Sequence, residues 1–165
     1  DRVVGKLVRA KRIYILGVRS SSFLAGYLNF YFHLIFENVT LVQSAAGEIF
    51  DQMLRIGPGD VLLAIGFPRY SKLTMSAVHF ARDRGAEVIA ITDSKMSPLY
   101  TLSVASLLVH CEMISFVDSM AAPVSLLNAL IVAVGKQKSA ETAETFAEME
   151  RVWSRYEIFG YEDDE

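Results

Sequence analysis

Apolar residues in this chain gather in five short runs, and a polar loop and a segment with helical spacing follow most of them. The runs comprise residues 13–16, 39–42, 61–65, 87–92 and 105–110. Residues 61–65 are continuously apolar, as expected for a parallel strand that is covered on both faces. This alternation predicts an α/β fold, a three-layer αβα sandwich with a five-stranded parallel sheet.

Helical periodicity fills the segments between these strands. It predicts helices at residues 2–11, 21–36, 45–54 and 72–84, a short helix after Pro98, and longer helices at 119–138 and 140–156. The helix at 21–36 carries large side chains almost all round, which suits either the core or, in part, a dimer interface.

The same pattern predicts how the chain is divided. We expect the end of a linker helix at residues 1–11 and the main domain at 12–138. A C-terminal helix at 139–158 is expected to pack on the domain, and 159–165 to form an acidic disordered tail.

Three polar loops leave the carboxyl ends of predicted strands, where ligands bind in such sheets. They comprise residues 17–20, 66–71 and 93–98. The first loop leads through Ser20, Ser21 and Ser22 into a helix, whose N-terminus has free N–H groups and a positive dipole end. This predicts a phosphate site, and simple helix capping by serine is the alternative.

Composition narrows the function classes. The chain has 165 residues, 52% of them hydrophobic, and a net charge of −3 with scattered basic residues, so it shows no nucleic-acid patch. Its single cysteine, Cys111, excludes an internal disulfide and suits a reducing, cytoplasmic compartment. No apolar run reaches the roughly 20 residues of a membrane span. The histidines lie on separate elements, so we expect no metal and no cofactor.

Several segments resemble the SIS (sugar isomerase) domain: residues 17–25, 59–65 with the following loop, and 85–99. Within that superfamily, residues 67–71 and 115–119 resemble the effector domains of RpiR-type (MurR/RpiR family) bacterial transcription regulators. The resemblance implies a flavodoxin-like doubly wound fold, a phosphorylated sugar ligand and a homodimer or higher homo-oligomer. It also implies DNA contact only through an N-terminal helix-turn-helix domain. The start at Asp1 rather than methionine fits the absence of such a domain from this chain.

The resemblance also implies roles for individual residues. Ser21 matches the phosphate-loop serine, Ser71 matches the Ser/Thr that ends the second loop, and Ser97 falls in the Ser-Pro-Leu motif. This chain departs from the family at Arg19 and Arg69, which stand where glycine is frequent. A guanidinium matches phosphate geometry, so Arg69 is a candidate ligand residue with Ser20 to Ser22. Contact with solvent or a dimer partner is the alternative for both arginines.

An isomerase would also need a base within reach of the sugar carbons. The candidates are Glu48, His79 and Glu112, and Glu48 is the best placed by chain order. None of them lies in a recognisable catalytic motif, so we expect a binding domain without catalytic activity. An aldose–ketose phosphosugar isomerase with Glu48 as base is the first alternative, and a dimerisation module with an empty pocket is the second.

Overall fold

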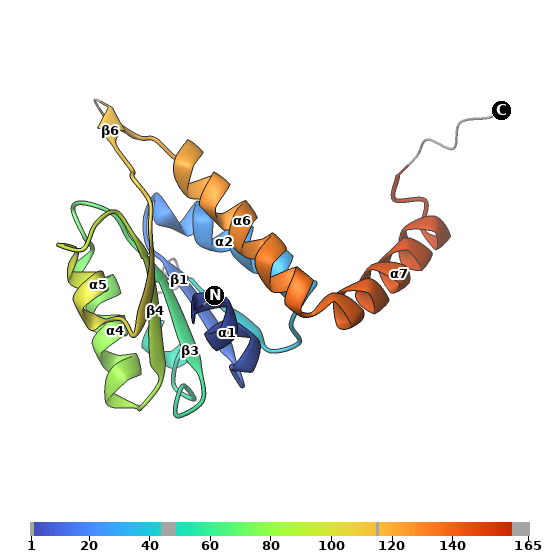
Figure 1. Ribbon diagram of the computed structural model, residues 1–165, viewed down its shortest axis with the longest axis horizontal. Helices are drawn as coiled ribbons and strands as arrows, with labels where there is room; N and C mark the ends of the chain where they lie inside the picture. Colours follow the sequence, from blue (N-terminus) through green and yellow to red (C-terminus); the bar gives the residue numbers. More distant parts are fainter. Residues whose placement is uncertain (1, 44–48, 115, 160–165) are drawn as a thin grey trace.

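The computed structural model describes residues 2–43, 49–114 and 116–159, which form a layered α/β domain around a parallel sheet (Figure 1). Among these residues the sheet has five strands, in the order β2-β1-β3-β4-β5, and every neighbouring pair is parallel. The strands are β1 (Ile13–Gly17), β2 (Val39–Val42), β3 (Val61–Ile65), β4 (Glu87–Thr92) and β5 (Ala105–Leu108). The predicted doubly wound sandwich is confirmed.

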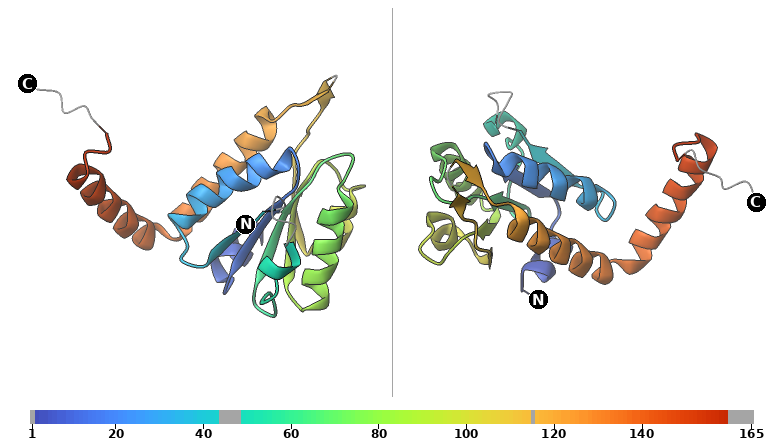
Figure 2. Two further views of the ribbon diagram at one scale, coloured as in Figure 1. Left: turned by 180° about the vertical axis from the view of Figure 1, so that it is seen from behind. Right: turned by 90° about the horizontal axis from the view of Figure 1, so that it is seen from above.

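Helices cover both faces of the sheet (Figures 1 and 2). One face carries α1 (Arg2–Arg9), α2 (Ser21–His33) and α6 (Ala121–Gln137). The other carries α3 (Ile49–Gln52), α4 (Lys72–Asp83) and α5 (Pro98–Leu102). The hydroxyl of Tyr27 on α2 donates a hydrogen bond to Oδ1 of Asn128 on α6 at 2.5 Å, so these two neighbours are also joined by a polar contact. No helix in the described part of the chain is long and apolar enough to cross a membrane.

The central strands feed two separate cores. Every residue of β1 and of β3 is buried. Because successive side chains of a strand point to opposite faces, Ile13 and Ile15 pack under α2 and α6, whereas Tyr14 and Leu16 pack under α3 and α4. This double burial explains why the strands are apolar throughout rather than alternating.

The register of the sheet places two predicted site loops beside each other. Ile13 pairs with Val61 and Gly17 pairs with Ile65, so β1 and β3 end at the same level. The loops that follow these strands therefore leave the sheet side by side, at its carboxyl edge.

A small hairpin precedes α6, the first of the two longer helices that the sequence predicts. β6 (Met113–Ile114) and β7 (Val117–Asp118) pair antiparallel, and Met113 lies opposite Asp118. The helix then begins at Ala121 with Met120 at its N-cap, and no side chain caps it. Asp118 therefore belongs to the hairpin rather than to the helix cap.

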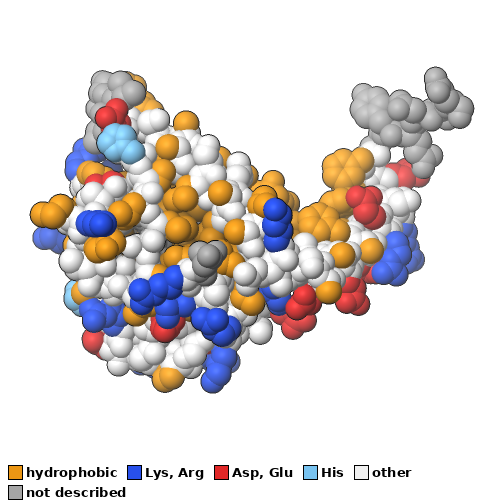
Figure 3. Space-filling view, viewed as in Figure 1, with side chains coloured by type: hydrophobic (Ala, Val, Ile, Leu, Met, Phe, Trp, Pro, Cys, Tyr) orange, Lys and Arg blue, Asp and Glu red, His pale blue; other side chains and the backbone are white. Residues whose placement is uncertain are grey.

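The C-terminal helix α7 (Ser139–Arg155) projects away from the sandwich (Figures 1 and 2). All of its residues are described, and none of them is buried. The packing of residues 139–158 on the domain therefore stays a prediction. The periodicity correctly indicated an apolar stripe, but α1, α2 and α6 already cover the nearby face of the sheet. Hydrophobic side chains stay exposed along α7 and at its C-cap, among them Phe146, Val152 and the C-cap residue Tyr156 (Figure 3). Apart from Phe159, the expected acidic tail lies outside the described residues.

Candidate functional site

A cleft of about 360 Å³ opens at the carboxyl edge of the sheet, between the loops that follow β1 and β3. The first turn of α4 and the end of β7 complete its walls. Its lining residues are Val18, Arg19, Ser20, Ser21, Ile65, Gly66, Phe67, Pro68, Arg69, Ser71, Thr74 and Asp118. The structure thus brings the first and second predicted loops together, as the parallel topology requires.

Two helix N-termini point into this cleft. α2 begins at Ser21, and α4 begins after its N-cap Ser71, whose Oγ accepts a hydrogen bond from the N–H of Leu73 at 3.2 Å. The turn into α2 needs a residue without a side chain, because a Cβ on Gly17 would lie 2.2 Å from the carbonyl oxygen of Ser21. The positive ends of two helix dipoles therefore favour an anion in this cleft.

Arg19 and Arg69 hold matching backbone conformations on the two loops. Their φ angles are 58° and 63°, both in the left-handed region. A side chain in that region costs roughly 1–2 kcal/mol, whereas glycine adopts it freely. This explains physically why glycine suits both positions. Here the loops keep the glycine-like turn and add two exposed arginines to the lining of the cleft.

The three consecutive serines have three different environments. Ser21 is buried and lines the cleft. Ser20 also lines it, but its hydroxyl donates to Oδ2 of Asp118 at 2.7 Å. Ser22 is exposed outside the lining, and its hydroxyl donates to the carbonyl oxygen of Arg19 at 2.6 Å. The sequence alone could not separate these roles, because the serines differ only in their long-range surroundings.

The structure does not bring Ser97 to the cleft. Its side chain is fully buried, and its Oγ accepts hydrogen bonds from the hydroxyl of Thr92 at 2.7 Å and from the N–H of Leu99 at 3.2 Å. Ser97 is the N-cap of α5, with Pro98 at the first helical position, a common pairing at helix starts. The Ser-Pro-Leu segment therefore has a structural role in this chain.

A hydrogen-bonded network beside the cleft joins the loop after β3 to the end of β4. The hydroxyl of Tyr70 donates to Oδ1 of Asp93 at 2.5 Å, and the hydroxyl of Thr92 approaches the same oxygen at 3.1 Å. Burial raises the pKa of Asp93, but the hydrogen bonds from Tyr70, the backbone and Thr92 outweigh it and leave this pKa below its ordinary value. Burial and the bond to Asp93 raise the pKa of Tyr70. Tyr70, the residue after Arg69, is therefore held in place by its hydrogen bond to Asp93.

Comparison with known families decides the identity of the fold. Residues 6–133 match the SIS domain family. The chain belongs to the SIS domain family. Comparison of the sequence with curated proteins finds no match.

Solved structures share the fold of this SIS domain at low sequence identity. The sugar isomerase domain of the RpiR transcription factor from Sphaerobacter thermophilus has a TM-score of 0.85 at 19% identity, covering 91% of this chain and 84% of that one. The Vibrio vulnificus NanR protein complexed with ManNAc-6P has a TM-score of 0.78 at 20% identity, covering 94% and 60%. The c3406 protein of E. coli CFT073 has a TM-score of 0.72 at 16% identity, covering 90% and 82%.

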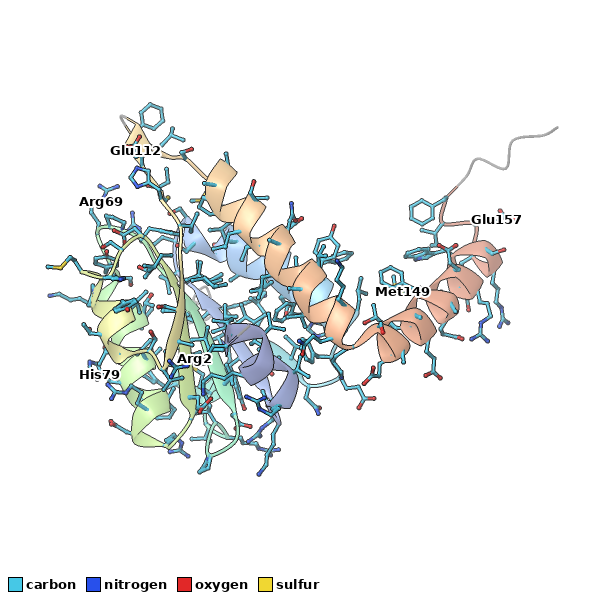
Figure 4. All side chains as sticks on the ribbon, viewed as in Figure 1. Arg2, Arg69, His79, Glu112, Met149 and Glu157 are labelled. Atoms are coloured by element: carbon cyan, nitrogen blue, oxygen red, sulfur yellow. The ribbon has the colours of Figure 1, made fainter. Side chains whose placement is uncertain are left out.

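Two of the acid–base candidates lie away from the cleft of this SIS domain, and the third is not described. His79 is exposed on α4, and Glu112 is exposed before the hairpin, where its Oε1 lies 2.8 Å from Nε2 of His110 (Figure 4). Neither lines the cleft. Glu48, the preferred candidate, lies outside the described residues.

Two lining residues were missed by the sequence analysis. Thr74 is buried in the first turn of α4, one turn beyond the predicted Ser71. Asp118 is the one acidic residue among the described residues that line the cleft. It lies 98 residues from Ser20 in the sequence, and the β6–β7 hairpin brings the two side chains together.

Proposed function

We propose that this SIS domain binds a phosphorylated sugar and acts as the effector domain of a bacterial RpiR-family transcription regulator. One observation carries the proposal: two helix N-termini, three cleft-lining serines and two arginines converge on a single cleft. The N-termini and guanidinium groups favour an anion, and hydroxyl groups suit the remaining polar atoms of a sugar phosphate. The cleft volume of about 360 Å³ also suits a small metabolite.

In this proposal the phosphate lies between the starts of α2 and α4. Ser21 and Ser71 donate to its oxygens together with backbone N–H groups of the two first turns. Arg69 contributes charge from the rim. The N–H of Ser22 is already bonded to the carbonyl oxygen of Arg19 at 2.9 Å, so it stabilises the turn and leaves ligand contact to its neighbours.

The fold likeness to the RpiR transcription factor and to NanR, whose structure contains ManNAc-6P, supports a regulatory role. A ligand regulates by binding one arrangement of the protein more tightly than another, without chemistry on the ligand. In this proposal, a domain outside these 165 residues contacts DNA.

Calorimetry with a panel of sugar phosphates tests the proposal. We expect Ser21→Ala and Ser71→Ala to weaken binding about tenfold, as the loss of a hydrogen bond to a charged group predicts. Ser22→Ala is the matched control, because it removes a neighbouring hydroxyl outside the cleft. Absence of binding in the wild-type protein, or equal affinities for Ser21→Ala and Ser22→Ala, would contradict the proposal.

A phosphosugar isomerase is the second candidate, and the carboxylate of Asp118 in the cleft favours it. Isomerisation moves a proton between adjacent carbons through a base, and exchanges it with solvent. Incubation of the panel in D₂O, followed by NMR, distinguishes the candidates. Deuterium at the carbon next to the carbonyl, lost in Asp118→Asn, would identify an enzyme, whereas binding without exchange supports the regulator.

The proposal includes self-association as a homodimer or higher homo-oligomer. Phe23 and Phe30 on α2 are 80% and 61% exposed. Exposed aromatic side chains on one helix are typical of a surface that contacts another protein chain. Light scattering measures the mass of the wild-type chain and of the double variant Phe23→Ser, Phe30→Ser. We expect a dimer or larger particle for the wild type and a smaller mass for the variant; a monomeric wild type would contradict this part.

A further inference from the structure

The carboxylate of Asp118 lies in the cleft in which we place a phosphate. It reaches that position through the β6–β7 hairpin, and the hydroxyl of Ser20 holds it at 2.7 Å. A carboxylate repels a phosphate at short range, and the repulsion is stronger where water is partly excluded. The cleft therefore contains one feature that a site for phosphate alone would not need.

The carboxylate of Asp118 enters the cleft from one side of the sheet only. Asp118 enters from the hairpin that leads into α6, on the same face of the sheet as α2. Ser71 and Thr74 enter from the start of α4, on the opposite face, and Arg69 precedes them on the same loop. Figure 4 shows Arg69 at the edge of the sheet from which the hairpin rises. The hairpin side thus has the carboxylate of Asp118 beside Arg19 and the start of α2, whereas the other side has Arg69 and the start of α4 without a carboxylate.

The charge of Asp118 also acts on Cys111, which precedes the hairpin. Burial raises the pKa of its thiol, and the charges of Asp118 and Asp93 raise it further. The Sγ atom lies 3.5 Å from the carbonyl oxygen of Ser119, next to Asp118 in the chain. Next to this carboxylate, hydrogen-bond donors are favoured over a second anion.

Building on the proposed function, we propose that Asp118 recognises the sugar and orients the ligand. Its carboxylate offers several acceptor positions, of which Ser20 occupies one, so the others accept hydrogen bonds from sugar hydroxyl groups. The same charge directs the phosphate to Ser21, Ser71 and the start of α4. Ser20 is then a positioning residue for Asp118 rather than a phosphate ligand.

The test is the affinity for a sugar phosphate divided by the affinity for inorganic phosphate. Calorimetry on the full chain at neutral pH measures both. The probes are inorganic phosphate and the sugar phosphate of the panel that binds the wild-type protein most tightly. In Asp118→Asn we expect the sugar phosphate to bind about tenfold more weakly, as the loss of hydrogen bonds to a charged group predicts. Inorganic phosphate is expected to bind equally well or more tightly, because a like charge is removed.

Glu112→Gln is the matched control. It removes one negative charge from the same hairpin region, but Glu112 lies outside the cleft and pairs with His110. We expect it to leave the ratio unchanged. Ser20→Ala keeps the charge of Asp118 and releases its carboxylate, so a smaller fall in the ratio is expected; it serves as the second variant if Asp118→Asn does not fold.

The outcomes separate the two proposals. A wild-type protein that binds no sugar phosphate overturns the proposed function and this inference with it. A wild-type protein that prefers the sugar phosphate, with the same ratio in Asp118→Asn or an equal change in Glu112→Gln, overturns the role of Asp118 alone. A fall in the ratio confined to Asp118→Asn and Ser20→Ala supports it.

Discussion

The hydroxyl of Tyr70 lies 2.5 Å from Oδ1 of Asp93 and connects the loop after β3 to the end of β4. This contact adjoins the strained residue Arg69, whose φ is 63°. A backbone conformation of that kind persists when neighbouring contacts hold it. The Tyr70–Asp93 bond is therefore part of what shapes one wall of the cleft.

Removal of this bond in Tyr70→Phe is expected to lower the free energy of unfolding by about 1.5–3 kcal/mol, typical of a hydrogen bond to a charged group. At about 2–4 °C per kcal/mol for a chain of this size, the melting temperature falls by roughly 3–12 °C. Thermal unfolding followed by circular dichroism measures it. Tyr100→Phe on α5 is the control for the loss of a tyrosine hydroxyl outside the network.

The same bond predicts a dependence on pH. The pKa of Asp93 is lower in the folded protein than its ordinary value, so the ionised carboxylate contributes stability above that ordinary value. This contribution is lost as pH falls through the lowered pKa. The stability difference between wild type and Tyr70→Phe should therefore be full at neutral pH and shrink in acid. Denaturant titrations at neutral and acid pH measure it, and a difference that grows in acid would contradict the assignment.

Gly17, at the end of β1, and Gly26, in the middle of α2, form a matched pair. A Cβ at Gly17 would lie 2.2 Å from the carbonyl oxygen of Ser21, whereas a Cβ at Gly26 meets no atom within 4 Å. We expect Gly17→Ala to destabilise the domain by about 1–3 kcal/mol or more, because the backbone must shift. Gly26→Ala should stabilise it by about 0.4–1 kcal/mol. Denaturant titration measures both, and equal effects would contradict this account of the turn.

Arg19 allows backbone strain to be separated from charge. Arg19→Gly and Arg19→Ala both remove the guanidinium, but only alanine keeps a side chain at a φ of 58°. We expect the glycine variant to be more stable than the alanine variant by roughly 1 kcal/mol. Both should bind a sugar phosphate more weakly than wild type, and by equal factors, if the charge attracts the ligand. Unfolding titrations and calorimetry on the two variants provide the measurements.

The projecting helix α7 is expected to contribute little to the stability of a single protomer. None of its residues, all of them described, is buried. A chain that ends at Lys138 should therefore keep its melting temperature within about 2 °C at low protein concentration, as expected for surface changes within about 0.5 kcal/mol. A larger loss at high concentration alone would show that α7 stabilises a contact between copies. A large loss at every concentration would show that the domain needs this helix.

The sequence by itself determined the layered fold, because its signals are local. Continuous apolar runs such as residues 61–65 specify strands covered on both faces, and the helical spacing between them specifies the crossovers. The same local logic placed Ser71 before α4, where it caps the helix, and placed Ser21 at the start of α2. The resemblance to the SIS family, rather than a local pattern, marked Arg19 and Arg69 as unusual, and both have left-handed backbones.

Only the tertiary structure decided which polar residues meet. Ser97 and Ser21 both stand at helix starts, yet one is enclosed under α5 and the other faces the cleft. Asp118 reaches Ser20 across 98 residues through a hairpin with no clear sequence pattern. Likewise, the sequence predicts an apolar stripe on α7 but does not show which surface this stripe packs against. Local periodicity determines secondary structure, whereas contacts between distant segments depend on how the helices and strands pack together in the folded chain.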